Sequence, residues 1–265
     1  MSNKGDLYLE KDGPIATLYF NRPEKRNAIS HEMWKAIPGL VHEVEEDSSI
    51  KVLILRGVDH TAFAAGADIS EFYSIMSSVE GAKLHNETTH IAERALVSLT
   101  KPSIAMIQGF CIGGGCELAV ACDFRFSDTN GRFGITPAKL GLVYSLEATK
   151  QLVDLVGPQN AKFILYSGKH FDIERAVRMG LVDEVYSPGE IEQKTYEFAK
   201  LLTENAQFPI RVAKYFVAQI LQGVNEETEE ARNLRLGSFE TSDYQEGVRA
   251  FMEKRKPQFT GNGHE

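Results

Sequence analysis

The sequence has few of the residues that mark several large classes of protein. Its three cysteines, Cys111, Cys116 and Cys122, are odd in number and lack the spacing or the neighbouring histidines of a zinc site, so we expect reduced, buried thiols and no metal. No window approaches the roughly 18 uncharged apolar residues of a membrane-spanning helix, and the polar N-terminal stretch has no apolar signal core. These absences predict a cytoplasmic protein without a membrane partner.

Basic residues are also fewer than acidic ones. The chain of 265 residues carries 29 lysines and arginines against 37 aspartates and glutamates, which gives a net charge of -8. A negative field repels a phosphate backbone, so nucleic acid is not expected as a main partner. The hydrophobic content of 43% and charged content of 25% are those of an ordinary globular protein, and the length allows a substantial buried core.

The stretch from residue 101 to residue 126 is the most informative part of the chain. A strand is expected over Ser103–Ile107, a turn at Gly109, and a helix opened by Gly113–Gly115 with Glu117 in its first turn. The first N–H groups of a helix lack intrahelical acceptors, and glycines let a ligand approach them. Because Glu117 would repel a resident phosphate, the stretch better suits an oxyanion formed during a reaction, with Glu117 moving a proton. The alternative is a tight turn whose glutamate complements the helix dipole.

Apolar periodicity predicts strands alternating with helices on both sides of this stretch, which indicates the α/β class. One helix is expected to start after Ser30, with Pro38 kinking or breaking it. A second segment of small residues, Phe63–Asp68, follows a buried strand and offers another N–H donor. From about residue 190 the chain is predicted to be almost entirely helical, with apolar faces that pack on the core or on another subunit. The remaining predicted elements are a hairpin over residues 7–11 and 15–20, strands over 52–55, 124–127 and 181–186, and helices over 69–72, 79–99, 145–156, 158–166 and 172–180.

Four ordered motifs together resemble the crotonase, or enoyl-CoA hydratase/isomerase, superfamily. They are Asn21-Arg22-Pro23, Ala65-Gly66-Ala67-Asp68, Gly113-Gly114-Gly115-Cys116-Glu117 and Phe251-Met252-Glu253-Lys254-Arg255-Lys256-Pro257, and they span nearly the whole chain. The resemblance implies an α/β spiral core of ββα repeats over residues 1–190 and a C-terminal helical trimerisation region over residues 191–265. It further implies a homotrimer or homohexamer and an acyl-CoA thioester as substrate, with no separate cofactor.

The resemblance also implies roles for individual residues. By position, the backbone N–H groups of Ala67 and Gly114 would form an oxyanion hole, and Glu117 would be the acid/base. Such a hole stabilises an enolate on the thioester oxygen, and the loss of one donor typically costs about 3 kcal/mol. The positions that would contact coenzyme A are Lys25, Arg26 and Ala28 near the nucleotide, Ala65, Asp68 and Ile69 along the pantetheine, and Phe251 and Lys254 from the C-terminal helix.

One position departs from the pattern of the two-glutamate hydratases in this superfamily. Their second glutamate falls on Pro137 here, and proline has no titratable group. The loop with Thr136, Pro137 and Tyr144 is similar to that of methylmalonyl-CoA decarboxylase, whose tyrosine is proposed to orient the substrate carboxylate. That enzyme has a histidine where this sequence has Ala67, and an alanine side chain donates no hydrogen bond.

Three hypotheses about function therefore remain open. In the first, the protein is an enoyl-CoA hydratase/isomerase with Glu117 as the sole family acid/base and Tyr144 or Glu147 as a helper. In the second, it is a methylmalonyl-CoA-type decarboxylase. In the third, it is a catalytically weak acyl-CoA-binding protein. Burying a glutamate is costly, so the presence of Glu117 favours the first hypothesis.

Overall fold

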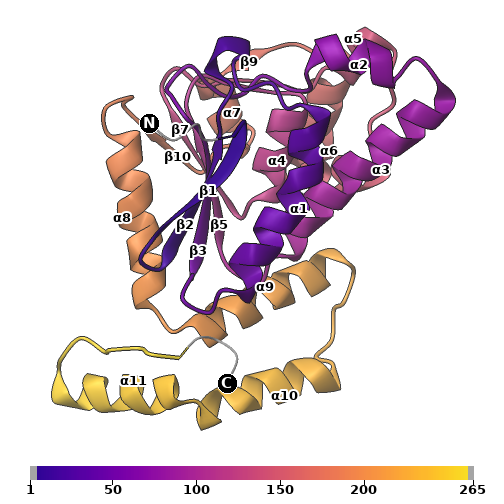
Figure 1. Ribbon diagram of the computed structural model, residues 1–265. Coiled ribbons are helices and arrows are strands. Elements are labelled where there is room, and N and C mark those ends of the chain that lie inside the picture. The colour runs from indigo at the N-terminus through magenta and orange to yellow at the C-terminus, as the bar shows by residue number, and fades with distance from the viewer. Residues whose placement is uncertain (1–4, 262–265) are drawn as a thin grey trace.

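The computed structural model (Figure 1) describes residues 5–261, apart from the side chains of residues 72 and 73. The outer ends of the two predicted regions, residues 1–4 and 262–265, lie outside the described residues. The predicted hairpin is confirmed: β1 (Leu7–Asp12) pairs antiparallel with β2 (Ile15–Phe20). Within the described residues, no helix is both long enough and apolar enough to cross a membrane.

Two sheets form the core of the protein. The larger sheet has six strands in the order β1-β2-β3-β5-β7-β10, with all pairs parallel except the first. The smaller sheet has the order β4-β6-β8-β9, in which the first two pairs are parallel and the last is antiparallel. The strands not yet located are β3 (Val52–Gly57), β4 (Ala62–Ala64), β5 (Ser103–Ile107), β6 (Phe110–Ile112), β7 (Phe124–Asp128), β8 (Arg132–Gly134), β9 (Phe171–Asp172) and β10 (Glu184–Tyr186).

The strand order shows a repeated ββα unit. The pairs β3–β4, β5–β6 and β7–β8 are each consecutive in sequence and each followed by helix. The first strands of these pairs are neighbours in the larger sheet, and the second strands are neighbours in the smaller sheet. Each unit therefore adds one strand to both sheets, which is the predicted α/β spiral. The second strands are only three residues long, too short to show a period of two in the sequence.

Helices cover both faces of the larger sheet. Most of the predicted helices are confirmed, and α6 is non-helical at Gly157 (φ 75°, ψ 161°), where two separate helices were predicted. The helices are α1 (His31–Glu46), α2 (Ile69–Ile75), α3 (Val79–Ser98), α4 (Gly114–Ala121), α5 (Pro137–Leu140), α6 (Leu146–Ser167), α7 (Ile173–Arg178), α8 (Ile191–Glu204), α9 (Gln207–Leu221), α10 (Glu229–Gly237) and α11 (Ser242–Glu253), with short 3-10 turns at Pro23–Lys25 and Ser238–Glu240.

The predicted break at Pro38 is wrong, because α1 continues from His31 to Glu46 with the proline inside it. Ser30 caps the helix by accepting a hydrogen bond from the Met33 N–H at 3.3 Å. A proline in a helix interior costs about 3 kcal/mol. Burial of apolar side chains on both sides of the proline offsets this cost, and these side chains are Met33, Trp34, Ile37, Val41 and Val44.

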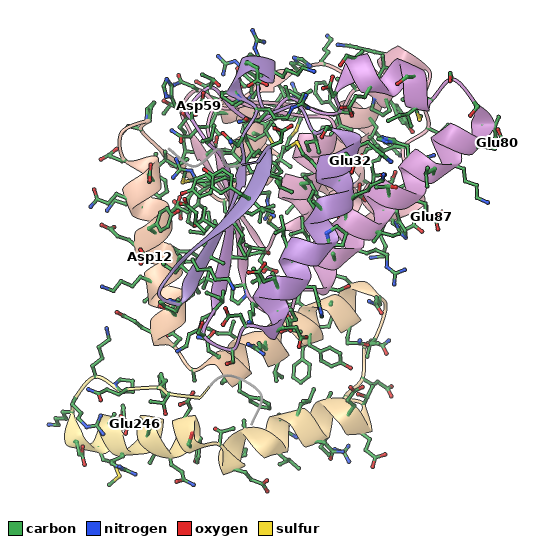
Figure 2. All side chains as sticks on the ribbon, in the orientation of Figure 1. Asp12, Glu32, Asp59, Glu80, Glu87 and Glu246 are labelled. Atoms are coloured by element: carbon green, nitrogen blue, oxygen red, sulfur yellow. The ribbon has the colours of Figure 1, made fainter. Side chains whose placement is uncertain are left out.

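The strands of the larger sheet are buried on both faces, which explains their uninterrupted apolar sequences. In β3, Val52 and Ile54 pack with Ile191 and Ala199 of α8, whereas Leu53 and Leu55 belong to the larger cluster on the other face. Figure 1 shows α8 alone on one side of the sheet and α1, α3, α4 and α6 on the other. Acidic residues such as Glu32 on α1 and Glu87 on α3 lie on the outside of this layer (Figure 2).

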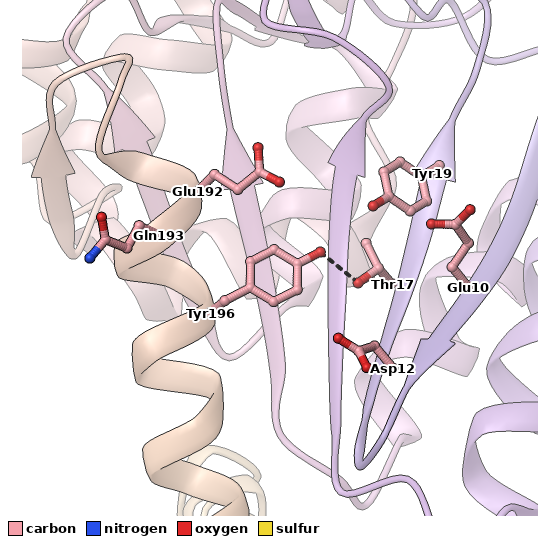
Figure 3. A pocket seen from close by; sticks show the side chains of 7 residues that line it. All are labelled: Glu10, Asp12, Thr17, Tyr19, Glu192, Gln193 and Tyr196. Carbon is pink, nitrogen blue, oxygen red and sulfur yellow. Dashed lines mark hydrogen bonds between the residues drawn. The ribbon is translucent and has the colours of Figure 1, made fainter.

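Polar contacts join α8 to the sheet next to the β1–β2 hairpin. The hydroxyl groups of Tyr196 and Thr17 are 2.9 Å apart (Figure 3), and Arg56 of β3 forms an ion pair with Glu192 at 2.9 Å. A surface hollow lies between these residues, and its lining also includes Glu10, Asp12, Tyr19 and Gln193. We interpret this hollow as the boundary along which α8 packs on the sheet.

The last three helices form an arm at one end of the molecule (Figure 1). Helices α10 and α11 lie beyond α9, at the end remote from α2, α3 and α5. Several large apolar side chains of the arm are exposed in the single chain: Val217, Ile220, Leu236, Phe239, Val248, Phe251 and Met252.

Candidate active site

The ends of two short parallel strands bring the two predicted N–H donors together. Strands β4 and β6 are neighbours in the smaller sheet, so the segments that follow them leave it side by side. The contact between these segments requires glycine at Gly66 and Gly113, which have φ of 101° and 52°. A Cβ on Gly66 would lie 3.2 Å from the Ile112 carbonyl oxygen, and a Cβ on Gly113 would lie 3.7 Å from Gly66 Cα. The close approach places Ala67 next to the start of α4.

Neighbouring residues make the hydrogen bonds that fix this geometry. The Asp68 N–H donates to the Ile29 carbonyl at 3.0 Å, and the Gly113 N–H donates to the Gly134 carbonyl at 2.8 Å. Gly114 is the first residue of α4, so its N–H has no acceptor within the helix. Within residues 5–261, no protein acceptor is recorded for the N–H groups of Ala67 and Gly114, which leaves them available to a ligand.

Ala67 and Gly114 line the same cavity of about 500 Å³. Its lining comes from α3, from the start of α4, and from the segment of residues 135–145, which includes α5. The ring of Trp34 closes the cavity below Gly114, where a Cβ would lie 2.7 Å from the indole Cζ2. The residues that α3 contributes are Ala82, His85, Asn86, Thr89, His90 and Glu93.

Glu117 lies in the first turn of α4 and lines the cavity. Its Oε2 is 3.5 Å from the point where a Cβ on Gly114 would stand, so the carboxyl group is close to the N–H donor. Burial raises the pKa of Glu117, while side-chain hydrogen bonds with Tyr144 and Glu93 act in the opposite direction. The site therefore holds a carboxyl group beside two N–H donors, which is the arrangement expected for proton transfer next to an oxyanion.

Tyr144 contacts Glu117 directly, as one of the two predicted helpers. Its hydroxyl group shares a hydrogen bond with Glu117, and burial together with the nearby charge of Glu117 raises the tyrosine pKa well above its usual range. Tyr144 is therefore a neutral hydrogen-bond donor. Glu147, the other predicted helper, is exposed and does not line the cavity. Pro137 does line the cavity, so the position without a titratable group faces the site.

Glu93 also lines the cavity and was not predicted from the sequence. This glutamate is only 5% exposed, lies on the buried face of α3 with Ala92 and Leu96, and hydrogen-bonds to Glu117. Burial first, and then the charge of Glu117, raise the pKa of Glu93 to about 9. Glu93 is therefore a neutral acid near pH 7. A signal was present in the sequence, because the glutamate occupies an apolar position of an amphipathic helix.

The structure divides the positions predicted to contact coenzyme A. Ala65 and Ile69 line the cavity with Ala67, and Ile69 is 73% exposed at its edge. Asp68 is instead buried below the loop, where Arg22 Nη2 and Lys25 Nζ each lie 2.8 Å from its Oδ2. Burial favours the protonated form of Asp68, but hydrogen bonds from Lys25, Ser70 and Arg22 outweigh this effect and lower its pKa. Asp68 thus braces the loop that carries the Ala67 N–H.

The three predicted nucleotide contacts lie on a segment that packs against this loop. Lys25 is held by Asp68, and the guanidinium of Arg26 lies 4.9 Å from the centre of the Phe110 ring. The Arg26 carbonyl accepts a hydrogen bond from the Ala65 N–H at 3.0 Å, and the Ala28 carbonyl accepts one from Arg22 at 2.9 Å. None of the three lines the cavity itself.

Phe251 and Lys254 lie apart from the cavity within one chain. Phe251 is 86% exposed on α11, and Lys254 ends that helix with a φ of 55°. Figure 1 shows α11 at the end of the molecule opposite α3 and α5. The single chain therefore does not bring these two residues to the site.

Comparisons with known proteins agree with the fold. The model of the enoyl-CoA hydratase/isomerase family matches residues 10–262. A short-chain-enoyl-CoA hydratase of Clostridium acetobutylicum is 34% identical over 252 residues, which cover 95% of this chain and 96% of that protein. A crotonyl-CoA hydratase of Syntrophomonas wolfei is 34% identical over 258 residues, covering 96% and 97% of the two chains.

A solved structure shows the same fold over the same length. The enoyl-CoA hydratase of Bacillus anthracis superimposes with a TM-score of 0.91 at 27% identity, covering 98% of this chain and 100% of that one. The family match and this superposition each extend over nearly the whole protein, and the ββα repeats lie within them. The chain therefore belongs to the enoyl-CoA hydratase/isomerase family of enzymes.

Proposed function

We propose that this protein processes an enoyl-CoA thioester, using Glu117 as acid/base beneath an oxyanion hole formed by the N–H groups of Ala67 and Gly114. The observation that carries the proposal is that all three groups line one cavity. The two relatives described above are named as hydratases of enoyl-CoA substrates, which supports a thioester of this kind.

The reaction that needs least from this site is isomerisation of a 3-enoyl-CoA to a 2-enoyl-CoA. The Glu117 carboxylate removes a proton from C2, and the electron pair moves into the thioester carbonyl to give an enolate. The Ala67 and Gly114 N–H groups donate to the enolate oxygen. Glu117 then returns the proton to C4, which restores the carboxylate and moves the double bond. One base suffices, so the absence of a carboxyl group at Pro137 is no obstacle.

Hydration of a 2-enoyl-CoA is the second candidate. It is favoured by the names of the relatives and by the presence of a second carboxyl group, Glu93, on the cavity wall. Hydration requires that a water molecule be activated and that a proton be delivered to C2. In this structure Glu93 is hydrogen-bonded to Glu117 rather than opposite it, so isomerisation fits the geometry better.

The geometry argues against decarboxylation of a malonyl-type thioester. Tyr144, which would have to orient the substrate carboxylate, is hydrogen-bonded to Glu117. The Glu117 carboxylate also lines this cavity, and its negative charge disfavours a substrate carboxylate. An acyl group without charge is the better fit.

The variant Glu117→Gln tests the proposal. It should lower kcat for isomerisation of 3-hexenoyl-CoA by roughly 10²- to 10⁴-fold, the usual contribution of a general base. Hydration of crotonyl-CoA and CO2 release from methylmalonyl-CoA are measured in parallel. The exposed Glu87→Gln on α3 is the matched control and should behave like the wild type.

Unchanged turnover in Glu117→Gln would contradict the role of Glu117. If the wild type turned over none of the three substrates but acyl-CoA raised its melting temperature, the protein would instead be an acyl-CoA binder.

A further inference from the structure

Two carboxyl groups meet at the inner end of the cavity without a cation between them. Glu93 approaches from α3 and Glu117 from α4, and their side chains share a hydrogen bond. In the part of the chain that the structure describes, neither forms an ion pair with a lysine, arginine or histidine. Two carboxylates in contact in a buried site cannot both be ionised, so the pair retains one proton near neutral pH.

The surroundings decide which of the two carboxyl groups keeps the proton. Glu93 is 5% exposed and has Glu117 and Glu147 as its charged neighbours, and both disfavour its ionisation. Glu117 is more exposed, accepts a hydrogen bond from Tyr144, and lies in the first turn of α4, where the helix dipole favours a negative charge. Glu93 therefore carries the proton and donates it in a hydrogen bond to the carboxylate of Glu117.

We propose that Glu93 is a positioning residue of this active site: its neutral carboxyl group donates a hydrogen bond to Glu117 and holds that carboxylate ionised and directed at the substrate. This inference rests on the proposed role of Glu117 as the base. Glu93 thereby supplies, from α3, the second carboxyl group that Pro137 does not supply from its loop. During proton transfer Glu93 keeps its own proton, so the exchange between Glu117 and the substrate stays balanced.

The proposal predicts a particular pH dependence. The titratable groups near Glu93 are Glu117 on α4, Tyr144 in the loop before α6, Glu147 on α6, and His90, which lines the same cavity from α3. His31 of α1 lies beside His85 of α3, with ring centres 5.9 Å apart. His85 precedes Glu93 by eight residues on α3, which is about two helical turns. When Glu93 ionises, with a pKa of about 9, its charge repels both the Glu117 carboxylate and the forming enolate. The alkaline limb of the kcat/KM profile therefore belongs to Glu93.

Variants at Glu93 test this role through the kcat/KM profile from pH 5 to pH 10. In Glu93→Gln the amide still donates to Glu117 but no longer titrates. This variant should keep activity at pH 7 within about tenfold of the wild type and lose the alkaline limb near pH 9. In Glu93→Ala the donor is absent, so activity at pH 7 should fall roughly 10- to 100-fold and the acid limb should move to higher pH. The control Glu87→Gln should keep the wild-type profile.

The outcomes separate this inference from the proposed function. If Glu93→Gln keeps the alkaline limb of Glu87→Gln, or if Glu93→Ala is as active as the wild type, the role of Glu93 is overturned while an inactive Glu117→Gln still supports the proposed function. If Glu117→Gln is fully active, the proposed function fails and the inference falls with it. Should Glu93→Ala not fold, the near-isosteric Glu93→Gln decides the question alone.

Discussion

Single glycines control the distance between the donors of the candidate oxyanion hole. Gly66 and Gly113 permit the contact between the two loops, and Gly114 permits Trp34 to pack below the start of α4. At Gly114 the reason is steric, because a Cβ would lie 2.7 Å from the Trp34 ring. At Gly66 and Gly113 the positive φ angles of 101° and 52° favour glycine, and a Cβ on Gly66 would also lie 3.2 Å from the Ile112 carbonyl oxygen. A substitution at Gly114, where φ is not positive, should therefore affect the reaction more than the fold.

Gly114→Ala is the sharpest test of this view. Its Cβ would lie 2.7 Å from Trp34 Cζ2, so either the indole or the Gly114 N–H must move. We expect kcat/KM to fall roughly 10- to 100-fold, a part of the loss seen when an oxyanion donor is removed. The control is Gly189→Ala, where a Cβ meets nothing within 4 Å. An unchanged kcat/KM in Gly114→Ala would argue against the Gly114 N–H as a donor.

The raised pKa of Glu93 also predicts how the stability of the protein depends on pH. Its pKa in the folded protein is about 9, above the ordinary value of 4.5, because burial favours the neutral form. The stability contributed by protonated Glu93 is fully present below pH 4.5 and is lost as the pH rises towards 9. The melting temperature of the wild type should therefore fall more steeply between pH 5 and pH 9 than that of Glu93→Gln. Parallel curves for the two proteins would contradict this prediction.

At the scale of elements, packing overrides local preference in α1. The sequence predicts that Pro38 kinks or breaks the helix, yet the helix continues because its apolar face is buried on both sides of the proline. The short strands β4, β6 and β8 show the opposite: each has only three residues, too few to show an alternation of apolar and polar residues, and yet each forms. They form because each pairs with a neighbouring strand in the smaller sheet.

The backbone at two glycines gives opposite predictions for the same substitution. Gly39 lies inside α1 and Gly13 lies in the β1–β2 turn with φ of 54°, and a Cβ meets nothing within 4 Å at either position. Gly39→Ala should stabilise the protein by about 0.5 to 1 kcal/mol, because alanine is the better helix former. Gly13→Ala should destabilise it by about 1 to 2 kcal/mol, because the left-handed conformation is strained for alanine. Denaturant unfolding measures both, and equal signs would show that the backbone conformation does not decide the effect.

At the scale of the whole molecule, the arm formed by α9, α10 and α11 is the part whose apolar side chains a single chain leaves exposed. Its exposed apolar side chains on α9, α10 and α11 have little to pack against within the chain. This agrees with the prediction of a homotrimer or homohexamer, which the single chain does not test. It also offers a reason why Phe251 and Lys254 lie far from the cavity of their own chain.

Light scattering measures the oligomeric state directly. We expect a mass of three or six chains for the wild type, because burying the apolar face of the arm drives association. The double variant Leu236→Asp and Val248→Asp should shift the mass towards one chain, since both residues are exposed on the arm. Val177→Asp, at an exposed apolar position of α7 outside the arm, is the control. A wild type with the mass of one chain would contradict the role given to the arm.

The class of fold, the glycine turn before α4 and the place of Glu117 after that turn could be predicted from the amino-acid sequence. These features are local, since each depends on residue types within a few positions of one another. The family resemblance added Ala67 as the partner of Gly114, and the neighbouring strands β4 and β6 account for that pairing.

That Glu93 lines the same cavity as Glu117 became visible in the folded chain alone. Glu93 and Glu117 are far apart in sequence and meet because α3 packs against α4, so no spacing rule connects them. Their protonation states follow from burial and from each other's charge, and both exist only in the folded chain. The distance of α11 from the cavity was likewise invisible in the sequence, because it depends on where the arm leaves the core.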